Sequence, residues 1–436
     1  MKGRWLARLM VLGSVFAAGC GASEKSADRE AEQPKPNSEA PAAEPVQTKP
    51  EPVTLTFYSA QGKVLEQFGA AERLKAKFPH ITLEVINSEP GKRYTDLIAA
   101  GILPDIIFEA NSLMRSTIIA YDFHYDLDEL IKKNKYDLNR FEANILAQAK
   151  HSNSEGKLYG LPYSVNRYAT VYNKDLFDKF GVPYPKDGLT WDDVYALAQR
   201  LTREDGGQVY QGFMMNTPGN YFLNNQLSLD PLHPTEDRAN VNTDGFKLLF
   251  ENLKRFYEIP NTKLTGVSFT NGDLAIMVGA VSTTQIAQFE AMNWDMVAVP
   301  TFKEKPSTGF KPAGLSMFIT KTSKHKDAAF QIIEYLVSDE FQTILARNGG
   351  GTTLASEEIR RQAGLDVPSL KGKNVQALYY YQHAPTPPAR ANHLTNVTVN
   401  FGNAFNKMIE NQTDVNTVLR TLEEEINKAI AEQKAR

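Results

Sequence analysis

Short apolar segments with two different periods follow one another along residues 53–108. Residues 53–58 and 81–85 alternate apolar and polar side chains, which is the period of two of a half-buried strand. Residues 64–78 repeat their apolar positions at helical spacing, and residues 94–100 suit a shorter helix. Residues 106–108 are apolar throughout, as in a strand covered on both faces. The order β-α-β-α-β predicts an α/β fold with a parallel sheet and right-handed crossovers.

Polar residues follow two of these predicted strands. Ser59 and Gln61 follow the first strand, and Glu109 and Asn111 follow the third. Because ligands of such sheets bind beyond the carboxyl ends of the strands, all four residues are candidate ligand contacts. A carboxylate at Glu109 could accept hydrogen bonds from two adjacent hydroxyls of a ligand. The alternative for Glu109 is a loop acid in water.

The rest of the chain predicts a second set of strands and helices. Residues 167–172 and 296–299 have the composition of strands, and residues 246–257 form an amphipathic pattern of helical period. Thr190, followed three residues later by Asp193, predicts a capping box at the start of a helix. The last third is mainly helical, with predicted helices over residues 328–337, 341–346 and 418–430.

The N-terminus has the features of an export signal. Three cationic residues precede an apolar run, residues 9–18, that is too short to span a bilayer. Small residues then precede Cys20, the only cysteine in the chain, and this pattern resembles the lipobox of bacterial lipoproteins. We expect residues 1–19 to be a lipoprotein signal peptide and Cys20 to carry a lipid anchor. The alternative is an ordinary secretory signal with a chance cysteine.

Residues 20–52 are rich in Ala, Glu, Pro, Ser and Lys and contain hardly any large apolar side chain. Such a segment cannot bury enough surface to offset the entropy lost on ordering, so it predicts a disordered tether between the lipid and a globular body. The expected location is the extracytoplasmic face of a cell membrane. The length of the tether favours a Gram-positive cell surface.

Charge and composition exclude several classes of function. The formal net charge is -3, and loss of three positive charges with the signal leaves about -6, without a basic stripe that would favour nucleic acid. The seven histidines lack the spacing of a zinc site. The sequence contains no nucleophile elbow and no phosphate-binding glycine loop followed by Lys and Ser or Thr. We therefore expect no catalytic residues, no metal and no cofactor.

Segments in a fixed order give the sequence a family resemblance. The segments are Pro104–Phe108, Gly156–Tyr163, Tyr172–Phe177, Phe180–Pro183, Thr190–Asp193, Phe269–Met277, Trp294–Pro300, Ile319–Lys324 and Ala328–Val337. Together they resemble family 1 extracellular solute-binding proteins, a group that contains many sugar-binding lipoproteins of ABC importers.

The resemblance implies a two-lobe, periplasmic-binding-protein-like fold of type II with a hinge and an interlobe cleft. It implies an N-terminal lobe from residues 53–165 with 316–372, and a C-terminal lobe from residues 166–315 with 373–436. The implied function is capture of a carbohydrate, a mono- or oligosaccharide, by hinge closure and its delivery to the permease subunits in the membrane. The protein is expected to be a monomer without enzymatic activity.

The resemblance also nominates ligand contacts. Tyr221 falls where sugar-binding relatives place a stacking aromatic, and Asn166 falls where a relative presents a polar contact at the hinge. Arg167 is either a ligand contact or a solvated cation at a strand edge. Ser282 stands near a point where many relatives have a tryptophan, which favours a smaller or differently shaped ligand. Arg390 is expected to close one side of the cleft.

Two other functions remain open from the sequence. One is a secreted carbohydrate-active enzyme, because a pair of catalytic carboxylates has no recognisable spacing in sequence. The other is a lipoprotein that binds a peptide or a partner protein. Turnover of an oligosaccharide would support the first, and absence of any response to sugars would favour the second.

Overall fold

The computed structural model describes residues 51–388, 394 and 397–435. The predicted signal peptide, the tether up to residue 50 with Cys20, and Arg390 lie outside these residues. A search of the described helices for one with the length and apolar content needed to cross a bilayer finds none.

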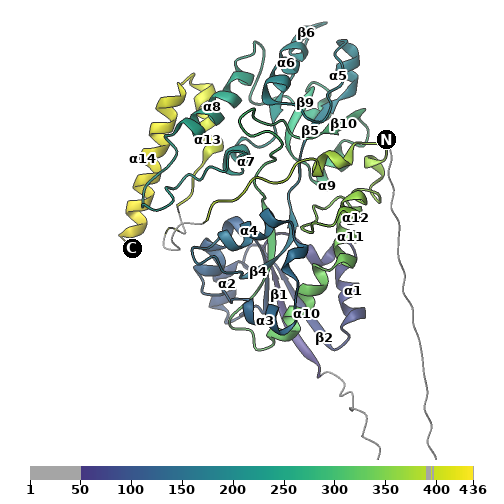
Figure 1. Cartoon of the computed structure of the whole chain (residues 1–436), viewed down its shortest axis with the longest axis vertical. Helices are drawn as coiled ribbons and strands as arrows, with labels where there is room; N and C mark the ends of the chain where they lie inside the picture. Colours follow the sequence, from purple (N-terminus) through teal and green to yellow (C-terminus); the bar gives the residue numbers. More distant parts are fainter. Residues whose placement is uncertain (1–50, 389–393, 395–396, 436) are drawn as a thin grey trace, which may run out of the picture. The chain divides into compact units, whose positions relative to one another are not determined.

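The first sheet contains the predicted parallel strands and has the order β2-β1-β3-β11-β4 (Figure 1). Strand β1 pairs in parallel with β2 and β3, so the predicted β-α-β-α-β unit is confirmed. Strand β11 is antiparallel to both β3 and β4. The strands are β1 (Val53–Ser59), β2 (Ile81–Asn87), β3 (Ile106–Ala110), β4 (Gly160–Val165) and β11 (Gly314–Ile319).

Both faces of the first sheet are covered, which explains the continuous apolar run in β3. Phe108 packs in one core cluster, whereas its neighbour Ile107 packs in another on the opposite face. The helices of this first lobe are α1 (Ala70–Lys77), α2 (Tyr94–Ala99), α3 (Asp128–Lys133), α4 (Ala143–His151), α10 (Lys326–Leu336) and α11 (Asp339–Arg347). Short turns add η1 (Val64–Glu66), η2 (Asn111–Leu113), η3 (Arg115–Ile119) and η4 (Leu138–Arg140).

One predicted helix of this lobe is interrupted. The pattern over residues 64–78 predicts a single helix, but the structure has the turn η1 followed by α1. Phe68 and Gly69 between them both have positive φ, at 57° and 67°. This left-handed pair cannot continue a right-handed helix, so the chain changes direction there.

The second sheet has the order β10-β5-β9-β8 and defines the second lobe. Strand β5 lies between β10 and β9 and is antiparallel to both. Its residues alternate between two core clusters, with Tyr168 and Tyr172 on one face and Ala169 and Val171 on the other. The strands are β5 (Tyr168–Asn173), β8 (Met214–Met215), β9 (Ile276–Ala280) and β10 (Trp294–Val297), with a separate hairpin of β6 (Arg203–Asp205) and β7 (Gln208–Tyr210).

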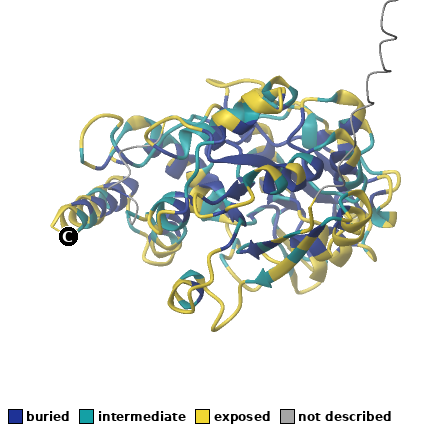
Figure 2. Ribbon diagram, turned by 90° about the horizontal axis from the view of Figure 1, so that it is seen from below, coloured by how far each residue is buried: buried dark blue, intermediate teal, exposed yellow. Residues whose placement is uncertain are grey.

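The helices of the second lobe carry most of its core. The predicted capping box is confirmed, because Thr190 accepts from the Asp193 backbone while the Asp193 carboxylate accepts from the Thr190 N–H at 2.8 Å. Buried positions lie on the strands and on the inward faces of the helices (Figure 2). The helices are α5 (Lys174–Lys179), α6 (Trp191–Leu201), α7 (Pro218–Leu223), α8 (Asp244–Tyr257), α9 (Thr283–Gln288), α13 (Phe401–Glu410) and α14 (Val415–Lys434), with turn η5 (Phe269–Asn271).

The chain passes between the sheets three times. It leaves β4 and enters β5 through Asn166 and Arg167, and it returns between β10 and β11. Because β11 begins at Gly314, the first sheet takes up the chain slightly before the predicted boundary at residue 316. The third passage is also earlier than the predicted boundary at 373, because Ile359 packs in the first lobe and Ala363 in the second. It uses α12 (Glu357–Arg361), and the turns η6 (Pro368–Leu370) and η7 (Val375–Tyr379) follow.

Candidate ligand-binding site

The structure brings Glu109 and Gln61 together at the carboxyl ends of β3 and β1. Glu109 is 2% exposed and accepts hydrogen bonds from Gln61 Nε2 at 2.5 Å and from the Tyr94 hydroxyl at 2.9 Å. Burial raises the pKa of the Glu109 carboxyl, although hydrogen bonds from Ala110 N–H, Gln61 and Tyr94 lower it in part. Glu109 is therefore neither a loop acid in water nor an open acceptor. It joins the strand ends to α2.

Ser59 and Asn111 are also buried at these strand ends. The Ser59 hydroxyl donates to the carbonyl of Gly62, so it closes its own turn. Asn111 is 1% exposed, and its Nδ2 donates to Gln148 Oε1 at 3.0 Å. Its Oδ1 is buried without a hydrogen-bond partner. Asn111 thus retains one unsatisfied acceptor, which is uncommon for a buried polar atom.

Tyr221 is a core residue, which corrects its predicted role as a stacking aromatic. Its side chain is 2% exposed and packs edge-to-face against Trp191 at 5.5 Å between ring centroids. Its hydroxyl donates to the Leu249 carbonyl and accepts from Asn252 Nδ2 at 3.0 Å. Tyr221 also lines a cavity of about 10 Å³, which is too small to hold a sugar ring.

Asn166 is exposed at the first passage between the sheets, as a hinge contact requires. Nearby, Asn224 Nδ2 donates to the Tyr168 hydroxyl at 3.1 Å, and Asn216 Nδ2 donates to the Ala280 carbonyl at 3.3 Å. Asn220 lines a small cavity of about 10 Å³ beside Tyr168. Planar amides therefore gather at this edge of the second lobe, where each can both donate and accept.

Ser282 has a structural role that the sequence comparison did not suggest. It is the N-cap of α9, where its hydroxyl accepts from the Gln285 backbone N–H at 3.3 Å. The Gln285 side chain completes a capping box by accepting from the Ser282 N–H at 3.1 Å. The side chain is exposed, and its hydroxyl is committed to the helix terminus.

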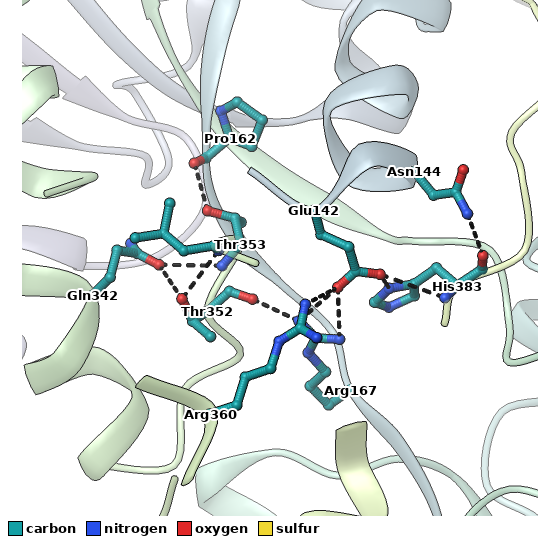
Figure 3. A network of polar contacts seen from close by, with 10 residues as sticks. Glu142, Asn144, Pro162, Arg167, Gln342, Thr352, Thr353, Arg360 and His383 are labelled. Atoms are coloured by element: carbon teal, nitrogen blue, oxygen red, sulfur yellow. Dashed lines mark hydrogen bonds and ion pairs between the residues drawn. The ribbon is translucent and has the colours of Figure 1, made fainter. Parts of the chain in front are cut away.

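Arg167 is buried in an ionic network and is not a solvated strand-edge cation (Figure 3). Its guanidinium lies 3.4 Å from Glu142 Oε2 and donates to the Thr352 carbonyl at 2.7 Å. Arg360 Nη2 reaches the same Glu142 oxygen at 2.9 Å. His383 Nδ1 lies 2.6 Å from Glu142 Oε1, and because a carboxylate only accepts, Nδ1 carries the proton.

The electrostatics of this network favour an ionised Glu142. Burial by itself would raise the pKa of Glu142, but the hydrogen bond from His383 and the charges of Arg167 and Arg360 hold it well below the usual range. Burial and the neighbouring Arg167 lower the pKa of His383, so the ring is neutral at pH 7. One carboxylate thus neutralises part of the charge of two guanidinium groups.

The network joins the first and third passages between the lobes to α4. Glu142 is the N-cap residue of α4 in the first lobe, and Arg167 lies in the first passage. Arg360 belongs to α12 in the third passage. His383 follows η7, and Asn144 of α4 donates to its carbonyl at 2.6 Å (Figure 3). These contacts lie together where the chain changes sheets, at a position that we call the pivot.

The cavities near this pivot are small. One of about 20 Å³ is lined by Arg167, Phe310 and His383, and another of about 10 Å³ is lined by Tyr168, Asn220 and Phe310. Each is close to the size that holds a single water molecule. A hollow of about 220 Å³ lies on the second lobe beside Trp191 and Arg255, and Asn252, a hydrogen-bond partner of Tyr221, also lines it. Among the described residues, no group of His, Cys, Asp and Glu is arranged to hold a metal ion.

Several polar residues of this region were missed from the sequence. Glu142, Arg360 and His383 have no shared spacing, because they meet only in the folded chain. Arg115 carries one usable signal, since it follows Asn111 by four residues in the segment directly after the third predicted strand. Lys311 lies just before β11, in the passage that returns to the first sheet.

The described region matches a known protein family. The family model described as bacterial extracellular solute-binding protein matches residues 57–343, more than half of the chain. A candidate binding protein of Brucella abortus (strain 2308) is 25% identical over 226 residues, or 47% of this chain and 53% of that protein. The chain thus spans about half the length of the first curated relatives that it matches.

Two further relatives have named ligands. The sn-glycerol-3-phosphate-binding periplasmic protein UgpB of Rhizobium meliloti (strain 1021) is 21% identical over 323 residues, or 70% of this chain and 75% of that protein. The arabinooligosaccharide-binding protein of Bacillus subtilis (strain 168) is 29% identical over 208 residues, or 45% of this chain and 41% of that protein.

Solved structures share the fold. The cyclic alpha-maltosyl-1,6-maltose binding protein of Arthrobacter globiformis superposes with a TM-score of 0.71 at 17% identity, covering 87% of this chain and 100% of that one. At this identity the likeness bears on fold alone. It confirms the expected α/β architecture of two lobes.

Proposed function

The chain belongs to the bacterial extracellular solute-binding protein family, and on this premise we propose that it captures a carbohydrate for an ABC importer. The observation that carries the proposal is the family match over residues 57–343, which includes both sheets and the first two passages between them. Relatives named for an arabinooligosaccharide and for a maltose-type cyclic sugar support a carbohydrate as the solute. A relative named for sn-glycerol 3-phosphate supports a polyol phosphate as the second candidate.

The proposed mechanism is closure of the lobes about the Glu142 network. A pivot held by buried ion pairs keeps the passages together while the lobes move as bodies around it. Asn166 is exposed beside this pivot, and Asn220 lines the adjacent edge of the second lobe. Their amides would pair with sugar hydroxyls, because each amide both donates and accepts.

The finer points of the proposal come from the sequence. Cys20 would carry the lipid anchor, and residues 20–52 would tether a monomeric body on the extracytoplasmic face of the membrane of a Gram-positive cell. The closed protein would dock on permease subunits and release its ligand unchanged. Catalysis, a metal and a cofactor have no part in this scheme.

Thermal denaturation of the purified full-length chain tests the proposal. A panel of mono- and oligosaccharides should contain at least one sugar that raises the melting temperature, because a ligand at a hundred times its Kd stabilises by about 2.7 kcal/mol. The sugar should be recovered intact after long incubation, since turnover would identify an enzyme. Absence of any response across the panel would contradict the carbohydrate proposal and favour a peptide or a partner protein.

A pair of asparagine variants tests whether Asn166 contacts the ligand. Asn166→Ala should weaken the response by about threefold to tenfold in Kd, as expected for loss of one hydrogen bond to a ligand. Asn134→Ala is the matched control, because Asn134 is exposed at the end of α3 and its Nδ2 donates to the Leu130 carbonyl. Equal affinities in the two variants would exclude Asn166 from the site.

A further inference from the structure

Arg115 lies in an unusual turn directly after the carboxyl end of β3. The turn η2 leads into η3, where Ile119 N donates to Met114 O and Ala120 N donates to Arg115 O. These bonds span five residues and define a π-turn, which is rare in proteins and recurs at functional sites. The turn carries Arg115 on the edge of the first lobe where ligands of parallel sheets bind.

The Arg115 side chain has no polar partner among the described residues. It is partly buried, and its Nη1 is fully buried without a hydrogen bond. Burial lowers its pKa, which is the expected consequence of removing a guanidinium from water. Arg167 and Arg360 are buried too, but both reach the Glu142 carboxylate. Arg115 is therefore a partly buried cation whose Nη1 donors are unused.

Lys311 is a second buried cation without an ion pair. It is 6% exposed, and its Nζ donates to one neutral partner, the Leu229 carbonyl, at 2.7 Å. Burial lowers the pKa of Lys311 to about 8. At pH 7 the ammonium still carries its proton in most molecules, and two of its N–H groups have no partner within the described chain.

Asp230 brings these two cations into one neighbourhood. It follows Leu229, whose carbonyl accepts from Lys311 Nζ at 2.7 Å, and its charge raises the pKa of both Arg115 and Lys311. Arg115 comes from the first lobe, Lys311 from the passage leading to β11, and Asp230 from the second lobe after α7. Asp230 Oδ1 accepts from the Leu232 N–H at 2.8 Å, and neither cation lies within ion-pair distance of it in the described structure. Two positive charges thus surround one negative charge.

Asn111 adds an acceptor to this group. It lies in the turn η2 that leads into η3, and its Nδ2 donates to Gln148, whose Nε2 donates to the carbonyl of Pro312, the residue after Lys311. Asn111 Oδ1 is buried and unpartnered, as is Arg115 Nη1. An unused donor, an ammonium with one neutral partner and an unused acceptor therefore belong to neighbouring segments of the fold.

We propose that Arg115, Lys311 and Asn111 form an oxyanion subsite, so that the solute of this protein is an acidic carbohydrate bearing a carboxylate or a phosphate. The inference rests on the proposed function and specifies its substrate class. Arg115 would donate to the oxyanion, Lys311 would supply the second positive charge, and Asn111 Oδ1 would accept from an adjacent hydroxyl. Arg115 and Lys311 carry two positive charges and Asp230 carries one negative charge, so the net charge of the group matches an acid with a single negative charge.

Selectivity follows from what a neutral sugar would leave unpaired. A buried cation without a partner costs free energy in the unliganded protein, and an oxyanion removes that cost on binding. A neutral sugar would leave Arg115 and Lys311 without a counter-charge from the ligand. Sites built to pair polar groups reject analogues that lack them more strongly than apolar pockets reject a missing methylene.

Calorimetric titration of the full-length chain with matched probes tests the inference. The acidic probes are digalacturonate, glucuronate and glucose 6-phosphate, and the neutral probes are galactobiose and glucose. At least one acidic probe should bind about tenfold or more tightly than its neutral counterpart, and its affinity should fall as sodium chloride is raised. The uronates and the sugar phosphate distinguish a carboxylate from a phosphate as the recognised group.

The outcomes separate this inference from the proposed function. Binding of a neutral sugar with equal or higher affinity, insensitive to salt, would overturn the acidic subsite and leave the carbohydrate-binding function standing. Absence of binding with every probe, neutral and acidic, would overturn both the acidic subsite and the carbohydrate-binding function. Binding of inorganic phosphate as tight as that of the sugar phosphate would overturn a carbohydrate subsite.

Substitutions test whether Arg115 and Lys311 cause the preference for the acidic probe. Arg115→Gln and Lys311→Gln should each weaken the acidic probe about tenfold or more, and Arg115→Lys should recover part of the loss because it keeps the charge. Lys303→Gln is the control, since Lys303 pairs with Asp192 at an exposed position elsewhere on the second lobe. Unchanged affinity of Arg115→Gln for the acidic probe would exclude Arg115 from the subsite.

Discussion

Two groups of buried charge lie where the lobes meet, and they differ in how their charges are paired. In the group around Glu142, both guanidinium groups and one imidazole reach a single carboxylate within 3.4 Å. In the group around Asp230, Arg115 and Lys311 have no ion pair among the described residues, and Asn111 keeps an unused oxygen. The first group is complete within the chain. The second is complete only if something else supplies an oxyanion.

The difference separates a structural use of buried charge from a binding use. Burial of a charge costs free energy, and partners inside the fold offset that cost before any ligand arrives. A charged group without a partner inside the fold can still form its ion pair with a ligand, and this adds to the affinity. The unliganded protein is less stable as a result. The Glu142 group should therefore control stability, and the Asp230 group should control affinity.

Glu142→Gln should have the largest effect of any single change at these groups. It leaves Arg167 and Arg360 buried without a counter-charge, and breaking a buried pair in this way costs about 3–5 kcal/mol. Urea denaturation at pH 7 measures the loss. Asp128→Asn is the control, because its ion pair with Lys132 at 2.5 Å is exposed and should contribute less than about 0.5 kcal/mol. Similar losses of unfolding free energy in Glu142→Gln and Asp128→Asn would contradict the stabilising role assigned to the Glu142 group.

Acidification should weaken the Glu142 group in two steps. The folded-state pKa of His383 is lowered, so its contribution is present above the ordinary histidine value of 6.5 and is lost as pH falls below it. The folded-state pKa of Glu142 is also lowered, so its contribution is present above 4.5 and is lost as pH falls further. The free energy of unfolding should therefore decline with falling pH, and below pH 4.5 it should decline more steeply in the native chain than in Glu142→Gln. Parallel pH curves would contradict the assignment.

Lys311→Met should act in the opposite direction, stabilising the unliganded chain by about 1–2 kcal/mol at pH 7. The lowered pKa of Lys311, about 8, means that the folded state loses its proton before the unfolded state, whose pKa is near 10.5. The native chain should gain stability as pH rises from 8 to 10.5, and the variant should lack that gain. Lys303→Met, with its side chain 70% exposed, is the control and should change stability by less than about 0.5 kcal/mol. A destabilised Lys311→Met would place Lys311 with the structural charges.

The sequence predicted those parts of the molecule that depend on local pattern. The parallel strands β1, β2 and β3 follow from their periods, and the capping box of Thr190 and Asp193 follows from a spacing within one turn. The parallel-sheet rule also located Glu109 and Asn111 correctly at strand ends. It could not give the role of Glu109, because Tyr94 and Gln61 reach it from segments whose orientation the pattern does not fix.

The candidate site was less predictable from the sequence, because its features depend on which charged side chains have a partner in the folded chain. Arg115 and Arg167 are both arginines close to a strand end, and only the fold shows that one is paired and the other is not. Tyr221 was placed in the site by resemblance, whereas packing against Trp191 and the bond from Asn252 put it in the core. Glu142 and His383 are far apart in sequence, and the passages of the chain bring them together.

The smallest expected effect gives the sharpest comparison, because the same substitution is made in both groups. Arg115→Gln should change the free energy of unfolding of the unliganded chain by less than about 0.5 kcal/mol, since no hydrogen bond or ion pair is lost. Arg360→Gln removes the 2.9 Å contact with Glu142 and should cost about 1.5–3 kcal/mol. Urea denaturation without ligand compares the two variants. If Arg115→Gln were as damaging as Arg360→Gln, Arg115 would have a partner within the fold, and its charge would no longer be available to a ligand.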